Sequence, residues 1–230
     1  MRELAKAAQR RLYPSLADPS YLTLRSRRLI FSAWTRQFRD KNLTVLDVGG
    51  RYQPYRPLLG DRVKNYLAVD LIRTEFVNAI ADAEALPFAP ATFDLVVATQ
   101  VFEYVRDPRQ ALRQIHAALK PGGIVLASFA ACAPRFGEDE RWRFTAAGIR
   151  SLLEPFASAD VIPELYSLAS LIRTVNLGLD SFAHYDGLRR LYRVTGCPLL
   201  NLAGLVAENL KLTSNDQFTA NYSVRAVKAA

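Results

Sequence analysis

The sequence predicts an α/β protein with a doubly wound, mostly parallel sheet of seven strands and helices on both faces. Short, largely aliphatic runs such as 43–48 and 93–99 are typical of strands buried on both faces of a sheet. Segments with helical spacing, such as 108–119, alternate with these runs, which is the order of an α/β fold. No internal repeat or low-complexity tract interrupts the 230 residues, so we treat the chain as one domain with an insertion.

The composition is that of an ordinary globular protein, with 50% hydrophobic and 23% charged residues. Cys132 and Cys197 stand far apart and outside any CxxC or Cys/His cluster, so we expect reduced thiols and no metal site. No apolar run approaches the roughly twenty residues of a membrane span, and the first residues lack the apolar core of a signal peptide. We therefore expect a cytoplasmic protein.

Basic residues gather near the N-terminus. The net charge is +8, and residues 1–41 hold ten basic and three acidic side chains, which leaves +7 in that segment. This segment could bind nucleic acid, an anionic membrane surface or an acidic substrate. It could instead be a solvated helix face, which is the interpretation that we favour. No aromatic-rich RNA-binding motif accompanies the charge, so nucleic acid is not expected, while peripheral contact with an anionic surface stays open. The sequence indicates no oligomeric state.

The first part of the chain reads as helix, strand and short connections. Residues 1–42 are predicted to be a basic helical segment packed on a domain of residues 43–230. Within it, 22–39 has helical spacing. Its predicted buried stripe is Leu29, Ile30, Ala33, Trp34 and Phe38, with Arg27, Arg28, Arg36 and Arg39 elsewhere. After the first strand, Pro57 suits the start of a short helix that Gly60 would end.

Two apolar runs follow, 66–69 and a weaker one at 76–81, separated by only about six residues. A parallel crossover usually needs a dozen residues or more. Either the third strand is short and tightly looped, or the usual crossover helix has been deleted.

The later elements are more regular. Strand 93–99 precedes a helix that Pro108 opens and Lys120-Pro121-Gly122-Gly123 ends, and 124–129 is a fifth strand. The predicted buried side of that helix is Ala111, Leu112, Ile115 and Leu119. Thr145 should cap a helix through about Leu153, before strands near 159–162 and 218–227. The apolar region 164–212 is interrupted by charged residues and by Gly187, which indicates a helical insertion.

Two strands end in acids at what should be one edge of the sheet. The first ends with Asp47 and then Gly49 and Gly50, where the absence of side chains lets a ligand approach the backbone. The second ends at Asp70, a position that holds ribose hydroxyls in nucleoside-binding α/β folds. The spacing after Gly50 departs from G-x-G-x-x-G, and an acid there would repel a pyrophosphate. A nucleoside with a cationic end, such as an aminopropyl-sulfonium, fits better.

On these residues the chain resembles the class I S-adenosylmethionine-dependent methyltransferases, which are Rossmann-like, and within them the small-molecule, ubiquinone-biosynthesis type. The resemblance covers about residues 43–156. Its motifs are Val45-Leu46-Asp47-Val48-Gly49-Gly50, Val69-Asp70, Asp82-Ala83-Glu84-Ala85-Leu86-Pro87-Phe88, Phe93-Asp94-Leu95-Val96-Val97, Gln100-Val101-Phe102-Glu103-Tyr104-Val105 and Leu119-Lys120-Pro121-Gly122-Gly123. Pro54-Tyr55 and Trp142-Arg143-Phe144-Thr145 are similar to a bacterial subset that often accompanies glycan or secondary-metabolite genes.

The resemblance implies S-adenosyl-L-methionine as cofactor and assigns residues to it. Those near its methionine end are Asp47, Gly49 and Gly50. Those near its nucleoside are Asp70 on the ribose hydroxyls, Leu71 packed on the adenine, Asp82 and Ala83 at the adenine edge, and the backbone of Thr99 and Gln100 facing the amino group. Two positions depart from the family: Arg51 stands where a further glycine is usual, and Tyr104 where a histidine often serves as a base.

The same resemblance implies methyl transfer, most simply to an oxygen of a small molecule or a sugar or glycan precursor. The protein mainly has to align nucleophile and methyl group. Tyr104 or Glu103 could orient or deprotonate the acceptor, and His184 could face it, while Trp142 and Arg143 could floor its pocket. Two alternatives stay open: an RNA methyltransferase that uses the basic arm, and a non-catalytic scaffold or partner subunit that keeps the fold.

Overall fold

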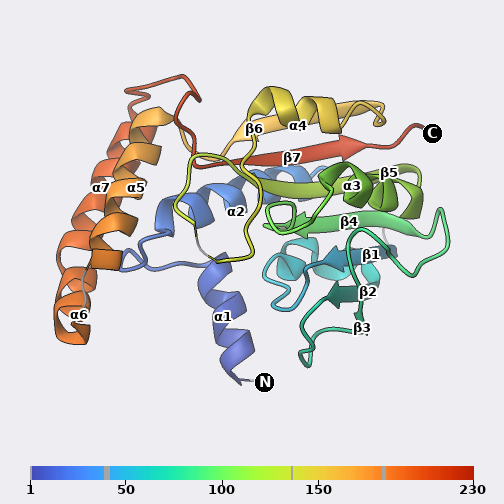
Figure 1. Cartoon of the computed structure of the whole chain (residues 1–230), viewed down its shortest axis with the longest axis horizontal. Coiled ribbons are helices and arrows are strands. Elements are labelled where there is room, and N and C mark those ends of the chain that lie inside the picture. The colour runs from blue at the N-terminus through green and yellow to red at the C-terminus, as the bar shows by residue number, and fades with distance from the viewer. Residues whose placement is uncertain (1, 39–41, 136, 183–184) are drawn as a thin grey trace.

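The computed structural model describes residues 2–38, 42–135, 137–182 and 185–230 (Figure 1). Its centre is a seven-stranded sheet in the order β3-β2-β1-β4-β5-β7-β6. The strands are β1 (Leu43–Val48), β2 (Val63–Asp70), β3 (Ala79–Ile80), β4 (Phe93–Thr99), β5 (Leu119–Ala130), β6 (Ser158–Pro163) and β7 (Asn221–Val227). Strands β1 to β5 pair in parallel, and β7 runs antiparallel to both of its neighbours. The predicted mostly parallel sheet is confirmed.

Helices cover both faces of this sheet. They are α1 (Arg2–Leu12), α2 (Tyr21–Thr35), the 3-10 helix η1 (Arg56–Arg62), α3 (Pro108–Ala118), α4 (Ala146–Leu152), α5 (Ser167–Phe182), α6 (Asp186–Val194) and α7 (Gly196–Asn209). One core cluster packs α3 and α4 on the sheet, and a second packs α2 and η1 on its other face. Helices α5 to α7 lie between β6 and β7 in the chain, as the predicted insertion requires (Figure 1). Of the helices in the described ranges, none has the length and apolar character needed to cross a bilayer.

Local signals explain where several elements begin. The Asp107 carboxylate accepts a 2.8 Å hydrogen bond from Arg109 N, and Pro108 occupies the first turn of α3. Thr145 Oγ1 accepts from Gly148 N at 3.1 Å and so caps α4, as predicted. Along β4, Leu95 and Val97 face one core cluster while Val96 and Ala98 face the other. A strand buried on both faces has to be apolar at successive positions, which is why this run was so clear in the sequence.

Two predictions about helix faces were wrong. Leu29 and Ala33 were expected in the buried stripe of α2 but are exposed, Leu29 to 44%, and Arg27 was expected outside the stripe but is buried. The buried side instead runs through Thr23, Arg27, Phe31 and Trp34. Arg27 can lie inside because Glu164 neutralises it there. In the second case, Leu119 belongs to β5 and pairs with β4, because α3 already ends at Ala118.

The sequence left two explanations open for the short connection between β2 and β3, a short third strand or a missing crossover helix, and the structure shows both. Strand β3 is only two residues long, and no helix occupies residues 71–78. Asn78 replaces part of the missing structure: its side chain accepts from Ala68 N at 2.8 Å, and its own N donates to Ala68 O at 2.9 Å. A side-chain amide thus completes the edge of β2 beyond the two-residue strand.

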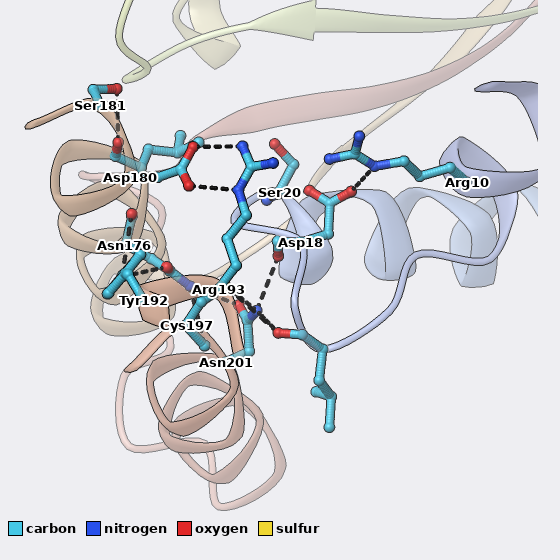
Figure 2. A network of polar contacts seen from close by, with 12 residues as sticks. Arg10, Asp18, Ser20, Asn176, Asp180, Ser181, Tyr192, Arg193, Cys197 and Asn201 are labelled. Carbon is cyan, nitrogen blue, oxygen red and sulfur yellow. Dashed lines mark hydrogen bonds and ion pairs between the residues drawn. The ribbon is translucent and has the colours of Figure 1, made fainter. Parts of the chain in front are cut away.

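Polar contacts join the N-terminal segment to the helical insertion (Figure 2). Arg10 Nε donates to Asp18 Oδ2 at 2.6 Å, and the buried Asn201 on α7 donates to the backbone oxygens of Leu16 and Asp18 at 2.8 and 2.9 Å. The loop between α1 and α2 is therefore fixed on α7. This places α1 beside the ends of the parallel strands.

Candidate active site

The ends of β1 and β2 bring two carboxylates together. Asp47 pairs with Ala68, so Asp47 and Asp70 lie on the same face of neighbouring strands. Asp47 is buried, and Tyr66 Oη donates a 2.6 Å hydrogen bond to its Oδ2. Burial raises the pKa of Asp47 to about 7, and the charge of Asp70 adds to the effect while the Tyr66 bond opposes it. The two acids are thus close enough to interact.

The glycines after β1 form a turn with no room for side chains. Gly49 has φ +73°, and a Cβ added there would lie 2.6 Å from Val101 Cγ2. A Cβ on Gly50 would lie 2.8 Å from Asp47 Cγ. Both glycine N–H groups donate to Val69 O, at 2.8 and 3.1 Å. The turn is therefore fixed against β2 and the segment after β4.

Asp70 combines a free acceptor with an apolar neighbour. Its Oδ1 accepts from Ile72 N at 2.9 Å, while no described residue hydrogen-bonds to its Oδ2. Leu71 beside it is 68% exposed. A carboxylate oxygen next to an exposed aliphatic side chain can accept hydroxyl groups and support a flat ring.

The next strand end along the edge carries Asp82 and Ala83. Ile80 of β3 pairs with Asp70, so the loop after β3 begins beside that acid. Asp82 is exposed and its Oδ1 accepts from Glu84 N at 2.9 Å, whereas Ala83 is buried. The resemblance assigned four residues at the ends of β2 and β3 to the nucleoside, and these residues therefore lie along one edge of the sheet: Asp70, Leu71, Asp82 and Ala83.

Thr99 and Gln100 end β4 on the opposite side of the glycine turn. Gln100 has φ +54°, an uncommon conformation for a residue with a side chain. Ser128 of β5 stabilises it by accepting from Gln100 N at its Oγ (3.1 Å) and its O (3.3 Å). Thr99, Gln100 and Gly49 line the same cavity.

Glu103 is the acid best suited to proton transfer. It is 2% exposed, it lines the cavity, and its Oε2 has no hydrogen-bond partner among the residues described. Burial raises its pKa to about 7, although Arg27 acts in the opposite direction. A carboxylate with a pKa near neutrality accepts protons much better than an ordinary one.

Tyr104 has a different character. Its hydroxyl donates to Glu140 Oε1 at 3.1 Å, and burial together with Glu140 raises its pKa to about 12. It is therefore protonated at neutral pH and is not a base, and because its one O–H is donated to Glu140, its oxygen can only accept a hydrogen bond from an acceptor molecule. Of the two residues predicted beyond β4, Glu103 is the better candidate for deprotonation.

Gly49, Thr99, Gln100, Glu103 and Tyr104 line a cavity of about 480 Å³, whereas the strand-end residues Asp47, Gly50, Asp70, Leu71, Asp82 and Ala83 are not part of its lining. One wall is the strand ends and the other is the N-terminal segment. The charged residues in its lining are Arg10, Arg11, Asp18, Arg27, Arg51, Glu103, Glu140 and Arg173. Arginines outnumber acids in this list, and the basic N-terminus accordingly turns part of its charge inward.

Two of these arginines meet at one aromatic ring. The guanidinium of Arg11 lies 3.9 Å from the ring centroid of Tyr52, and that of Arg51 lies 5.2 Å from it. Burial lowers the pKa of Arg11, and the charge of Arg51 lowers it further. Two cations held this close together are favourably placed to bind an anion.

Trp142 and Arg143, which were predicted to floor the acceptor pocket, are not among the residues that line this cavity. Trp142 Nε1 donates to Val105 O at 2.8 Å. Arg143 forms an ion pair with Glu140 and lines a separate hollow of about 670 Å³ that contains none of the strand-end acids or glycines. His184 lies outside the described residues. Within the described ranges, no cluster of three or more His, Cys, Asp or Glu side chains could hold a metal ion.

Sequence reasoning missed the residues that shape the far side of the site. Arg27 forms two hydrogen bonds with Glu164, at 2.6 and 3.0 Å, inside the protein. Burial alone would lower the pKa of Arg27, but the charge of Glu164 raises it above its ordinary value. Glu164 was a visible signal, as a lone acid at the start of an apolar region. Tyr66 could also have been found, since it faces Asp47 once β1 and β2 are paired.

Comparison with known proteins gives the family. The profile of a family described as "Methyltransferase domain" matches residues 21–171. The mouse protein "Arginine-hydroxylase NDUFAF5, mitochondrial" is 31% identical over 138 residues, which are 56% of this chain and 38% of that protein. Malonyl-[acyl-carrier protein] O-methyltransferase 1 of Coxiella burnetii is 32% identical over 93 residues, 37% of this chain and 33% of the relative. The chain thus spans about a third of the length of these two relatives.

Solved structures give the fold. Phosphoethanolamine N-methyltransferase 2 of Haemonchus contortus, in complex with S-adenosyl-L-methionine, superimposes with a TM-score of 0.56 at 15% identity, over 97% of this chain and 60% of that one. The [4+2]-cyclase SpnF gives 0.53 at 17% identity, over 89% and 81%. The chain belongs to the class I methyltransferase family, with the Rossmann-like fold of that class and S-adenosyl-L-methionine as its cofactor.

Proposed function

We propose that this chain transfers a methyl group from S-adenosyl-L-methionine to an oxygen atom of a small acceptor, such as a sugar derivative or metabolite, that carries an anionic group. One observation carries the proposal. A single cavity contains Gly49 of the glycine turn, the buried Glu103 and the arginines at Tyr52. Cofactor, proton acceptor and anion site would then share one space.

The strand ends suit the cofactor. Asp70 would accept the ribose hydroxyls through its free Oδ2, and the exposed Leu71 would support the adenine. Asp82 and Ala83 would meet the adenine edge, and the backbone of Thr99 and Gln100 its amino group. Gly49 and Gly50 would border the methionine end, near the buried Asp47. The cofactor supplies a methyl group already activated by a sulfonium.

Glu103 would remove the proton of the acceptor. The acceptor oxygen would bond to the methyl carbon as the carbon–sulfur bond breaks, and the hydroxyl proton would pass to the Glu103 carboxylate, whose buried Oε2 has no hydrogen-bond partner among the described residues. Tyr104 would help to hold the acceptor by accepting a hydrogen bond at its hydroxyl oxygen, since its proton is donated to Glu140. Alignment of the oxygen with the methyl group supplies most of the rate enhancement in such an arrangement.

Arg11 and Arg51 would hold the anionic group of the acceptor. Arg27 and Arg10 in the same cavity already have carboxylate partners in Glu164 and Asp18. Arg11 and Arg51 instead contact the ring of Tyr52. A carboxylate or phosphate between them would relieve the repulsion between the two cations.

The experiment is a methyl-transfer assay that follows S-adenosylhomocysteine release with paired acceptors. Each pair has a hydroxyl beside a carboxylate or phosphate in one member and beside an uncharged amide or ester in the other. Removing both charges with R11Q/R51Q should raise KM for the anionic member at least tenfold, because a charge-assisted hydrogen bond contributes about 1.5–3 kcal/mol. The uncharged member should be little affected. R113Q, on the exposed face of α3, is the control.

Equal turnover of both members of every pair would contradict the anionic acceptor, and so would equal loss in R11Q/R51Q. The mass of the product identifies the reaction. Addition of one methylene means methyl transfer, whereas addition of one oxygen atom would mean hydroxylation, which the name of the mouse relative suggests. Product formed on RNA alone, with steeply salt-dependent RNA binding, would favour the RNA methyltransferase.

A further inference from the structure

The helical insertion exposes a row of large apolar side chains. On α6, Leu188, Leu191 and Val194 are 53%, 58% and 69% exposed, and on α7, Leu199, Leu202 and Val206 are 68%, 46% and 52% exposed. Their spacing of three or four residues gives each helix one outward stripe. We call these six residues the apolar face. Monomeric proteins seldom expose this much apolar surface without a binding role.

The inner sides of α5 and α7 combine a small apolar cluster, which includes Ala169 and Ala207, with several buried polar residues. Asn176 of α5 and Asn201 of α7 are fully buried, and Asn176 Nδ2 donates to Asn201 Oδ1 at 3.1 Å. Ser170 and Arg173 of α5 are also buried. The segment therefore buries polar as well as apolar residues while it leaves the six large side chains of the apolar face outside. A partner that is itself apolar would account for the exposed side chains.

Polar contacts fix the orientation of α6. Arg193 donates to both carboxylate oxygens of Asp180, at 2.6 and 2.8 Å, and Tyr192 Oη donates to Asn176 Oδ1 at 2.6 Å (Figure 2). No residue of α6 is buried. The helix is thus held to α5 by its polar side chains, which leaves the Leu188 and Leu191 side facing outward.

Positive charge borders this surface. Arg190 lies one helical turn before Val194 and is exposed, and Lys211 is exposed directly after Leu210. Neither forms an ion pair with any described residue. Residues 164–212 hold five basic and four acidic side chains, and Asp186 is the one acid of α6, so the charges that an anionic surface would neutralise are those of Arg190 and Lys211 and not the net charge of the chain. A helix with leucines on one side and arginines on the other is typical of helices that lie in the membrane interface.

We propose that the apolar face docks on an anionic lipid surface, with α6 lying in the interface and Arg190 and Lys211 among the headgroups. The helices α5 to α7 lie together at one end of the molecule (Figure 1). None of the six residues lines the cavity of the candidate active site. The inference is therefore independent of the proposed function.

The test is flotation of the full chain with vesicles of phosphatidylcholine, with and without phosphatidylglycerol. Binding should be strong only with the anionic lipid. L188S/L191S should weaken it at least tenfold, because each buried leucine contributes substantially to partitioning. R190Q/K211Q should weaken it roughly 25-fold, at about fivefold per charge. I162S replaces an exposed isoleucine on β6, away from these helices, and should bind as the unmodified chain does.

Three results would overturn the proposal. The first is absence of flotation with anionic vesicles at millimolar lipid. The second is flotation that L188S/L191S does not reduce. The third is a dimer in sedimentation velocity that L188S/L191S dissociates, in a chain that does not float, which would assign the apolar face to a second copy. Circular dichroism of each variant should match the unmodified chain, since every substituted residue is exposed.

Discussion

Glu103 is the residue whose environment has the clearest chemical consequence. It is buried beside the cavity, its Oε2 has no hydrogen-bond partner among the described residues, and its pKa is raised to about 7. Keeping it ionised in such a place costs folding free energy, because desolvation disfavours the charge. A costly buried acid beside a cavity is typical of a functional site.

We therefore predict opposite effects of E103Q on stability and turnover. The folded pKa lies above the ordinary value of 4.5, so the free energy of unfolding falls as pH rises from about 4.5 to 7. At pH values above this window, E103Q should be more stable than the unmodified chain, by on the order of 2 kcal/mol, and below it the gain should vanish. Urea unfolding at several pH values measures this.

In turnover, the unmodified chain should show kcat/KM rising with pH through about 7 as Glu103 loses its proton, and E103Q should lose that rise. If E103Q gains no stability at high pH, the pKa of Glu103 is not raised. A pH profile that is the same in both proteins would remove Glu103 from the chemistry while leaving its burial intact.

Single residues were predictable from the sequence where a strand presented them. Asp47 and Asp70 end apolar runs, and parallel strands bring such ends to one edge. Arg11 and Arg27 were missed, because helical periodicity marks which side chains are apolar but cannot show that a charged one has an internal partner. Burial of Arg27 depends on Glu164, which is 137 residues away in the chain.

At the level of elements, the Arg27–Glu164 pair joins α2 to the end of β6. Glu164 follows β6 directly, and it also accepts hydrogen bonds from Asn221 and Ser223 of β7, at 3.2 and 2.9 Å. Both of its oxygens are thus fully used. This arrangement connects one helix and two strands through a single buried carboxylate.

We predict that E164Q lowers the free energy of unfolding by about 3–5 kcal/mol, because Arg27 would stay buried without a counter-charge. The control is K6A, which removes an exposed ion pair with Glu3 and should change stability by less than about 0.5 kcal/mol. The midpoint of urea unfolding at constant m-value measures both. A loss in E164Q no larger than in K6A would mean that water reaches Arg27.

Elements were predictable where the chain gave a local signal. Thr145, Pro108 and the aliphatic run of β4 each fixed a boundary. Strand β3 was the weakest, since two residues carry no periodicity and its support comes from the Asn78 side chain. The orientation of α5 to α7 was also beyond sequence reasoning, because buried polar residues such as Asn176 and Asn201 bond to each other inside while several leucines of α6 and α7 stay exposed.

For the molecule as a whole, the strand order explains why these residues meet. The chain passes from β1 outward to β2 and β3 on one side, and to β4 and β5 on the other. A crevice at the carboxyl ends follows from such a reversal. Helices α1 and α2 close it from the N-terminal side, so the cavity combines strand ends that the sequence predicts with arginines that only the folded chain brings near.

The central claim is that Asp70 and the glycine turn hold the cofactor, and calorimetric titration with S-adenosylhomocysteine tests it most directly. The unmodified chain should bind, and D61A, which removes an exposed aspartate of η1, should bind equally well. D70A should bind about ten- to a hundredfold more weakly, from loss of roughly 1.5–3 kcal/mol of hydrogen bonding to the ribose. Unchanged affinity in D70A would contradict the site, and absence of binding by the unmodified chain at millimolar ligand would leave only a non-catalytic member of the family.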